Sequence, residues 1–74
     1  MNYQYKSPVG RFFIKPLRND RWGLQLKDEL LGSYHSPMAA ADDVNTQATG
    51  DLQWDVGVWT EVPSSIHGWE VVSQ

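Results

Sequence analysis

The sequence predicts a small α+β domain in which an antiparallel sheet of about three strands packs on one helix, followed by a tryptophan-rich C-terminal segment. Residues 22–27 alternate strictly between apolar and polar side chains, which is the pattern of a half-buried strand. An alanine-rich run follows, bounded by a Ser-Pro pair and a glycine, as is typical of a helix. A chain of 74 residues has room for one domain, so residues 1–74 are assigned to a single domain. Four tryptophans supply much of the volume of its core.

The first half of the chain predicts three strands. Residues 1–8 are polar and aromatic, and we expect them to form a loose lead-in. Residues 11–17 and 22–27 have the composition of strands, and residues 31–35 form a shorter third one. The sheet is therefore expected to begin at about residue 11.

The hydrophobic pattern fixes the register of the first two strands. A three-residue loop over 18–20 places Phe12 opposite Leu26 and Ile14 opposite Leu24. A two-residue loop would instead bring lysines onto the apolar face, because a shift of one residue reverses the face of every side chain. We therefore predict the three-residue loop.

The same alternation predicts a basic and aromatic face on the other side of the sheet. A two-residue turn at Asp28 and Glu29 would place Tyr34 beside Gly23 on that side. With the loop arginines, the candidate binding surface consists of Arg11, Phe13, Lys15, Arg18, Arg21, Lys27 and Tyr34.

The helix is predicted over residues 37–48. Ser36 is a suitable N-cap, Pro37 fits the first helical position, and Gly50 is placed to end the helix in a left-handed conformation. One narrow stripe of small residues should be buried, namely Ala41, Val44 and Ala48. Asp42 and Asp43 should face solvent.

The C-terminal third predicts less regular structure. Apolar residues of one parity over 52–58 favour an extended segment, and Trp59, which is out of parity, is expected to be the most exposed tryptophan. Residues 62–68 suit a single helical turn between a proline and a glycine. Residues 69–72 suit a last short strand or a packed tail.

Composition limits the class of protein. The absence of cysteine excludes disulfides and thiolate zinc sites, and fits a reducing compartment. No apolar run approaches the roughly 18 residues of a membrane span, and no signal-peptide pattern is present. We expect a soluble, cytoplasmic protein with no membrane association, whose oligomeric state the sequence leaves open.

No motif indicates catalysis, a metal ion or a cofactor. His35 and His67 stand alone, without the spacing of metal ligands. Ser64 and Ser65 lie close to His67 but lack the Gly-x-Ser-x-Gly elbow of a nucleophile. A pocket that joined His67 to an acid and one of these serines would favour a small hydrolase.

Charge is distributed unevenly along the chain. All six basic residues lie in the first 27 positions, opposed only by Asp20, whereas the remainder carries eight acids. The two parts therefore carry about +5 and −8. We expect the acidic C-terminal segment to fold over the basic face, so that its acids neutralise the basic residues; these acids include Asp51, Asp55, Glu61 and Glu70. The alternative is that the basic face stays free for a partner.

Part of the sequence resembles the ethylene-response-factor type of DNA-binding domain. The matching residues cover roughly half of the chain: Arg21-Trp22, Leu31-Gly32-Ser33-Tyr34 and Ser36-Pro37-x-Ala39-Ala40-Ala41-x-Asp43. That family has a three-stranded sheet and a helix and reads DNA from its sheet. The resemblance therefore implies DNA contacts at the corresponding sheet positions Arg11, Lys15, Arg21 and Lys27. The whole chain also resembles small bacterial proteins to which no function is attached.

These observations favour a small non-enzymatic interaction module with a protein partner. The alternative is a nucleic-acid-binding module that uses the basic outer face of the sheet. Exposure of Phe13 and Tyr34 should distinguish the two.

Overall fold

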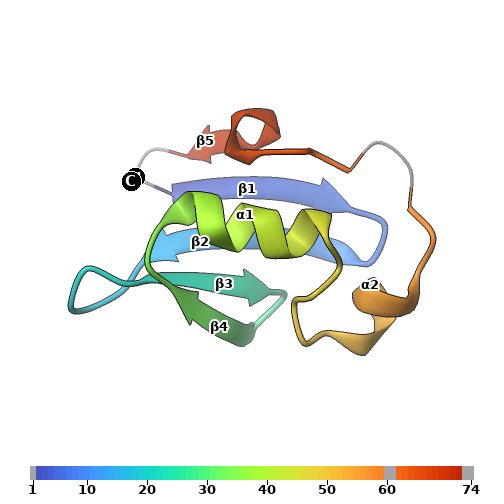
Figure 1. Cartoon of the computed structure of the whole chain (residues 1–74), viewed down its shortest axis with the longest axis horizontal. Helices are drawn as coiled ribbons and strands as arrows, with labels where there is room; N and C mark the ends of the chain where they lie inside the picture. The colour runs from blue at the N-terminus through green and yellow to red at the C-terminus, as the bar shows by residue number, and fades with distance from the viewer. Residues whose placement is uncertain (1, 60–61, 73–74) are drawn as a thin grey trace.

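The computed structural model describes residues 2–59 and 62–72 of the chain. It confirms the α+β class, but the antiparallel sheet has five strands instead of about three. In chain order the elements are β1 (Asn2–Ser7), β2 (Gly10–Pro16), β3 (Trp22–Leu26), β4 (Glu29–Tyr34), α1 (Pro37–Asn45), α2 (Leu52–Val56), the 3-10 turn η1 (Ile66–Gly68) and β5 (Glu70–Val72) (Figure 1).

The expected lead-in is strand β1, so that prediction was wrong for residues 2–7; Met1 lies outside the described residues. The strand order is β4-β3-β2-β1-β5, and β1 pairs with β2 on one side and β5 on the other. Tyr5 lies opposite Phe12, and its ring packs 5.6 Å from that of Trp69. The alternation of aromatic and polar residues at positions 2–6 is a strand pattern. Tyr3 and Tyr5, on one face of this strand, pack against the core.

The predicted register of β2 and β3 is confirmed. Phe12 lies opposite Leu26 and Ile14 opposite Leu24, and all four side chains are buried. The backbone N–H of Leu17 donates to the carbonyl of Arg21 at 2.7 Å, which closes the three-residue loop over 18–20. The apolar face thus decides the pairing, as expected for a sheet with one covered face.

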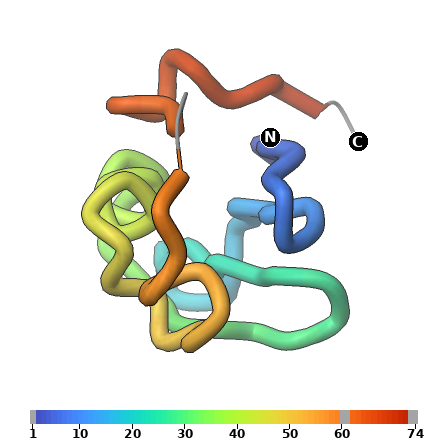
Figure 2. Tube along the Cα trace, turned by 90° about the vertical axis from the view of Figure 1, so that its right-hand side faces the viewer, coloured from blue at the N-terminus to red at the C-terminus, as the bar shows by residue number. Residues whose placement is uncertain are grey.

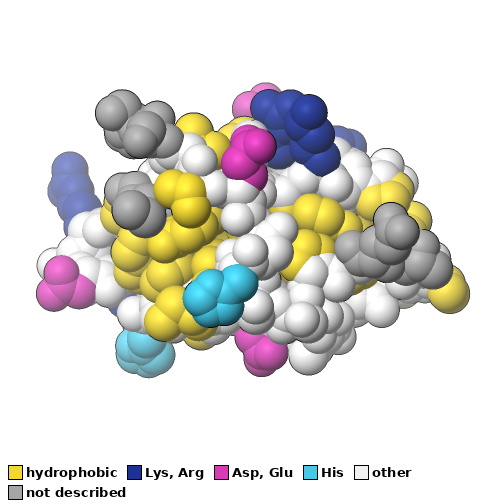
Figure 3. All heavy atoms as spheres, turned by 90° about the horizontal axis from the view of Figure 1, so that it is seen from above, with side chains coloured by type: hydrophobic (Ala, Val, Ile, Leu, Met, Phe, Trp, Pro, Cys, Tyr) yellow, Lys and Arg dark blue, Asp and Glu magenta, His cyan; other side chains and the backbone are white. Residues whose placement is uncertain are grey.

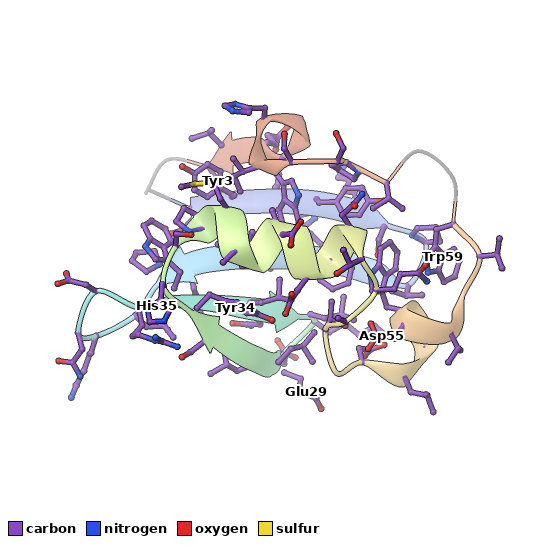
Figure 4. All side chains as sticks on the ribbon, viewed as in Figure 1. Tyr3, Glu29, Tyr34, His35, Asp55 and Trp59 are labelled. Atoms are coloured by element: carbon purple, nitrogen blue, oxygen red, sulfur yellow. The ribbon has the colours of Figure 1, made fainter. Side chains whose placement is uncertain are left out.

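The predicted position of Tyr34 is wrong because the next turn and the strand after it differ. The turn is formed by Lys27 and Asp28, and β4 then contains a one-residue irregularity opposite Leu24 and Gln25. Tyr34 consequently pairs with Trp22 on the side of α1, where it lies alongside the helix (Figure 4). A bulge adds one residue to a strand and so reverses the face of those that follow.

Helix α1 begins as predicted and ends earlier. The Ser36 Oγ accepts a hydrogen bond from the Ala39 N–H at 3.1 Å, which caps the first turn. The helix ends at Asn45, because Gln47 adopts a left-handed φ of 58° and its side-chain amide donates to the backbone carbonyl of Trp54 at 2.9 Å. Val44 and two alanines are buried, whereas Ala48 lies beyond the helix and is exposed. Asp42 is exposed as predicted and Asp43 half-buried.

The segment over 52–58 is not extended as expected, because Leu52–Val56 form helix α2. The Asp51 side chain caps it by accepting from the Trp54 N–H at 3.0 Å. Trp54 is fully buried and donates from its ring to the Val44 carbonyl at 2.9 Å, whereas Val58 is 94% exposed. One buried tryptophan therefore determines the local structure here, not the parity of the apolar residues.

Trp59 is half-buried, as is Trp22, whereas Trp54 and Trp69 are buried, so Trp59 is one of the two more exposed tryptophans. Its ring stacks on that of Trp54 with centroids 5.3 Å apart, and its Nε1 donates to the Trp54 carbonyl at 2.8 Å (Figure 4). The expected helical turn over 62–68 is present as η1 over its last three residues, and β5 is the expected last short strand.

The molecule has two layers. Helices α1 and α2 and the turn η1 lie on one side of the sheet, and no described element lies on the other (Figure 2). The core between the layers consists of Val9, Phe12, Ile14, Leu24, Leu26, Ala40, Ala41, Val44, Trp54, Ile66 and Trp69. Within the part of the chain that the structure describes, no helix is long and apolar enough to cross a bilayer.

Candidate functional site

We define the outer sheet face as the side of the sheet that points away from α1. Paired residues share a face, and alternate residues of a strand point to the same side. The register therefore assigns to this face Asn2, Gln4, Lys6, Arg11, Phe13, Lys15, Gly23, Gln25, Leu30, Ser33, Glu70 and Val72. These residues come from all five strands.

Phe13 occupies the centre of the outer sheet face. It pairs with Gln4 on β1 and with Gln25 on β3, and Gln25 in turn pairs with Leu30 on β4. Phe13 is half-buried. The register places one glutamine on each side of it across the sheet. Gln25 donates to the Lys27 carbonyl at 3.0 Å, and Gln4 donates to the Glu70 carboxylate.

Three cations surround Phe13. Arg11 and Lys15 lie two residues before and after it on β2, at a spacing of about 6.5–7 Å along a strand. Lys6 is paired with Arg11 on the neighbouring strand. Of the described residues on this face, Glu70 is the only acid, and it lies at the β5 edge. Viewed from the β5 side, lysine and arginine side chains gather at one margin of the molecule (Figure 3).

The β3–β4 side of the outer sheet face is apolar. A Cβ atom on Gly23 would lie 2.9 Å from Leu30 Cδ1 and 3.0 Å from Leu17 Cδ1, so the two leucines pack directly over the glycine backbone. Leu30 is nevertheless 53% exposed. The face therefore combines cations on β1 and β2 with two leucines packed over Gly23 on β3.

Arg21 is anchored at the end of this face. Its Nη2 donates to the Ser33 carbonyl at 2.9 Å, and its Nε donates to the Ser33 Oγ at 3.1 Å. Its Nη1 lies 3.1 Å from His35 Nδ1. Since a guanidinium only donates, that imidazole nitrogen accepts, and the neutral ring carries its proton on Nε2. Arg21 thus connects the start of β3 to the end of β4. Because its guanidinium already donates to Ser33, it is less available to a ligand.

Only some residues of the predicted binding surface lie on the outer sheet face. Arg11, Phe13 and Lys15 lie on the outer sheet face, whereas Arg18 and Lys27 lie in the flanking turns and are exposed. Tyr34 lies on the opposite side, as described above. Gln4 and Lys6 were missed because residues 1–8 were not assigned to the sheet, although their alternation was visible.

Two acids of the C-terminal segment, Asp51 and Asp55, have partners away from the outer sheet face, whereas Glu70 lies on that face and accepts from Gln4. Asp51 caps α2, and the two carboxylate oxygens of Asp55 accept from the N–H groups of Thr49 at 3.0 Å and Gly50 at 2.9 Å. Glu61 lies outside the described residues. Of the described C-terminal elements, α2 and η1 lie on the α1 side and β5 joins the edge of the sheet, so this segment does not fold over the basic face as we expected (Figure 2).

A groove of about 380 Å³ lies between α1 and η1. It is lined by Met38, Ala39, Asp42, Ser64, Ser65, Ile66 and His67, and histidine and hydrophobic side chains are visible on this side of the molecule (Figure 3). The bond between Ser65 and His67 runs from the backbone N–H of His67 to the Ser65 Oγ at 3.3 Å and does not involve the imidazole. Among the described residues, no group of three potential metal ligands is close enough to hold an ion.

No protein-family model matches the chain, and comparisons with curated proteins and with solved structures find no match.

Proposed function

We propose that the chain is a small non-enzymatic interaction module whose partner binds the outer sheet face. One observation carries the proposal: no described element covers this face, although it bears Phe13, Leu30 and three cations. The opposite face is buried under α1, α2 and η1. An antiparallel sheet with one uncovered face normally exposes polar residues there. Apolar and aromatic side chains among cations favour a binding surface.

The groove between α1 and η1 supports catalysis less well. It contains His67, Asp42 and two serines, the residue types that a small hydrolase needs. The Ser65 hydroxyl, however, caps η1, and a nucleophile needs its hydroxyl held by the base. We therefore propose a structural role for these serines.

A protein is the partner expected from the sequence, and a nucleic acid is the second candidate. The position of Phe13 between Arg11 and Lys15 specifically favours the second, because aromatic rings among cations bind bases and phosphates. The absence of cysteine fits a reducing compartment, and we place this role in the cytoplasm.

Site-specific photocrosslinking tests the binding face without assuming the class of partner. A photoreactive phenylalanine derivative replaces Leu30 on the outer sheet face or, as the control, the exposed Asp42 on α1. In cells that produce the protein, we expect an adduct from position 30 and none from position 42. The adduct should disappear when Lys6 and Arg11 are also replaced by Gln. An adduct from position 42 alone would place the partner on the other layer and contradict the proposal.

A further inference from the structure

We infer that the partner of the outer sheet face is a single-stranded nucleic acid, one base of which stacks on Phe13. The inference rests on the proposed function and names the ligand class for the same surface. It depends on three features of the face: a central aromatic ring, amides beside the ring, and cations on both sides of it.

The residues that lie side by side across β1, β2 and β3 supply the contacts to the base. Phe13 lies between Gln4 and Gln25 on the adjacent strands, where side chains directly opposite each other are about 4.5–5.5 Å apart at Cβ. A base stacked on the phenyl ring would therefore have a carboxamide near each of two edges. Stacking is tolerant of sequence because every base has a π face, and amides can donate to or accept from base edges.

The cations supply the contacts to phosphates. Arg11 and Lys15 bracket Phe13 along β2, and Lys6 extends the cationic side onto β1. A strand laid along β2 would thus keep a cation within reach before and after the stacked base. Leu17 and Leu30 lie over Gly23, beyond Gln25, on the side of the sheet away from Lys6.

Charge complementarity favours a polyanion on this face over the layer of α1. The chain as a whole carries −3, so attraction must come from the local cations and not from the total charge. Asp42 and Asp43 on α1 and Asp51 and Asp55 around α2 place negative charge on the opposite layer. A nucleic acid would therefore be repelled from the layer of α1 and attracted to the outer sheet face.

Phe13 distinguishes a single strand from the other polyanions. Bases within a duplex are stacked on each other and present only their edges to a flat surface, whereas single-stranded bases can be splayed onto an aromatic ring. An acidic peptide matches the cations but has no base to stack. Affinity that depends on the aromatic character of position 13 is therefore diagnostic.

The salt dependence of binding tests the phosphate contacts. We would titrate labelled single-stranded DNA and RNA oligonucleotides with the full chain by fluorescence anisotropy at several salt concentrations. Three cations should give a slope of about −2 in log K against log salt, at about −0.7 per phosphate. Lys15→Gln should reduce the slope by about 0.7. Arg18→Gln, which removes an equal charge from the flanking loop, should leave it unchanged.

Phe13→Leu tests the stacking directly. Leucine keeps an apolar side chain at the position but has no aromatic face, so affinity should fall about fivefold or more while the salt slope stays the same. Gln25→Glu is a companion variant that places a negative charge beside the ring, and it should also weaken binding. Unchanged circular dichroism and urea midpoints would confirm that both variants fold.

Several outcomes would overturn the inference. These are no binding at low salt, equal affinity for a matched duplex, poly-glutamate binding as tightly as the oligonucleotide, or no effect of Phe13→Leu. If the position-30 crosslinker captures a protein while oligonucleotides fail to bind, the proposed binding face stands and this assignment of its ligand fails. Absence of any adduct from position 30 would count against the proposed function itself.

Discussion

Tyr34 lies on the α1 side of β4, near Asp43 of the helix. Burial, and after it the neighbouring carboxylate of Asp43, raise the pKa of Tyr34 from 10.0 to about 12. The neutral phenol is thus the form that the fold requires. The residue expected on a binding surface instead lies on the side of the helix.

The alkaline pH dependence of stability should report this contact. Because the folded-state pKa of Tyr34 lies above its unfolded value, its contribution is complete below about pH 10 and is lost as the pH rises through about 12. The urea midpoint of the parent protein should therefore fall more steeply over this range than that of Tyr34→Phe. Parallel pH profiles of the two proteins would show that the hydroxyl contributes nothing. Both contain the same lysines and other tyrosines, so the variant is a matched control.

At the scale of elements, strand pairing determines which side chains lie on the outer sheet face and which form the core. The β2–β3 register places Leu24 under α1 and Phe13 on the opposite face. Leu24 on β3 and Phe13 on β2 therefore lie on opposite faces of the sheet, and the stability cost of replacing each should reveal its face.

Leu24→Ala should lower the free energy of unfolding by about 2–5 kcal/mol, because it leaves a cavity in the core. That is a large share of the roughly 5–15 kcal/mol that stabilises a typical domain. Phe13→Leu should cost much less, since its ring is only half-buried. Urea denaturation of the two variants measures both values. A stable Leu24→Ala beside an unfolded Phe13→Leu would show that the two faces are reversed.

The elements that could be predicted from the sequence are those with a strong local signal. The β2–β3 register follows from Phe12, Ile14, Leu24 and Leu26, and the start of α1 follows from the Ser36-Pro37 pair. The end of α1 could not be predicted in this way. Gln47 accepts a left-handed backbone because its amide bonds to carbonyls seven to ten residues away, which no local pattern encodes.

The candidate site was predictable to a similar degree. Alternation on β2 placed Arg11, Phe13 and Lys15 together, whereas β1 was missed because its hydrogen bonds run to strands at both ends of the chain. The one-residue irregularity in β4 moved Tyr34 to the other side. Bulges depend on how a strand fits its neighbours, so the residues of β4 alone do not reveal this one.

The whole molecule is elongated, with extents of 33 × 20 × 19 Å, and its two layers differ in charge. The cations on the outer sheet face come from the first 27 residues, whereas Asp42, Asp43, Asp51 and Asp55 lie on the layer of α1 and α2. If the cations serve a partner, the isolated fold should depend little on them.

The variant Lys6→Gln/Arg11→Gln/Lys15→Gln should therefore keep the stability of the parent to within about 1 kcal/mol, because exposed charges contribute little to folding. Thermal and urea denaturation at two salt concentrations measure the change. A large loss of stability would indicate that these cations pair with acids within the chain. It would then follow that the basic face is used in folding and not in recognition.

The pairing of Asn2 with Val72 brings the two ends of the described chain to the same place, at the edge where β1 meets β5. A host protein could therefore carry this domain as an insert within a single surface loop, since the entering and leaving strands are neighbours. Under a pulling force applied to both ends, β5 would peel from β1 one hydrogen bond at a time. The first mechanical event would be the release of this three-residue strand, while the remaining four strands and α1 stay together.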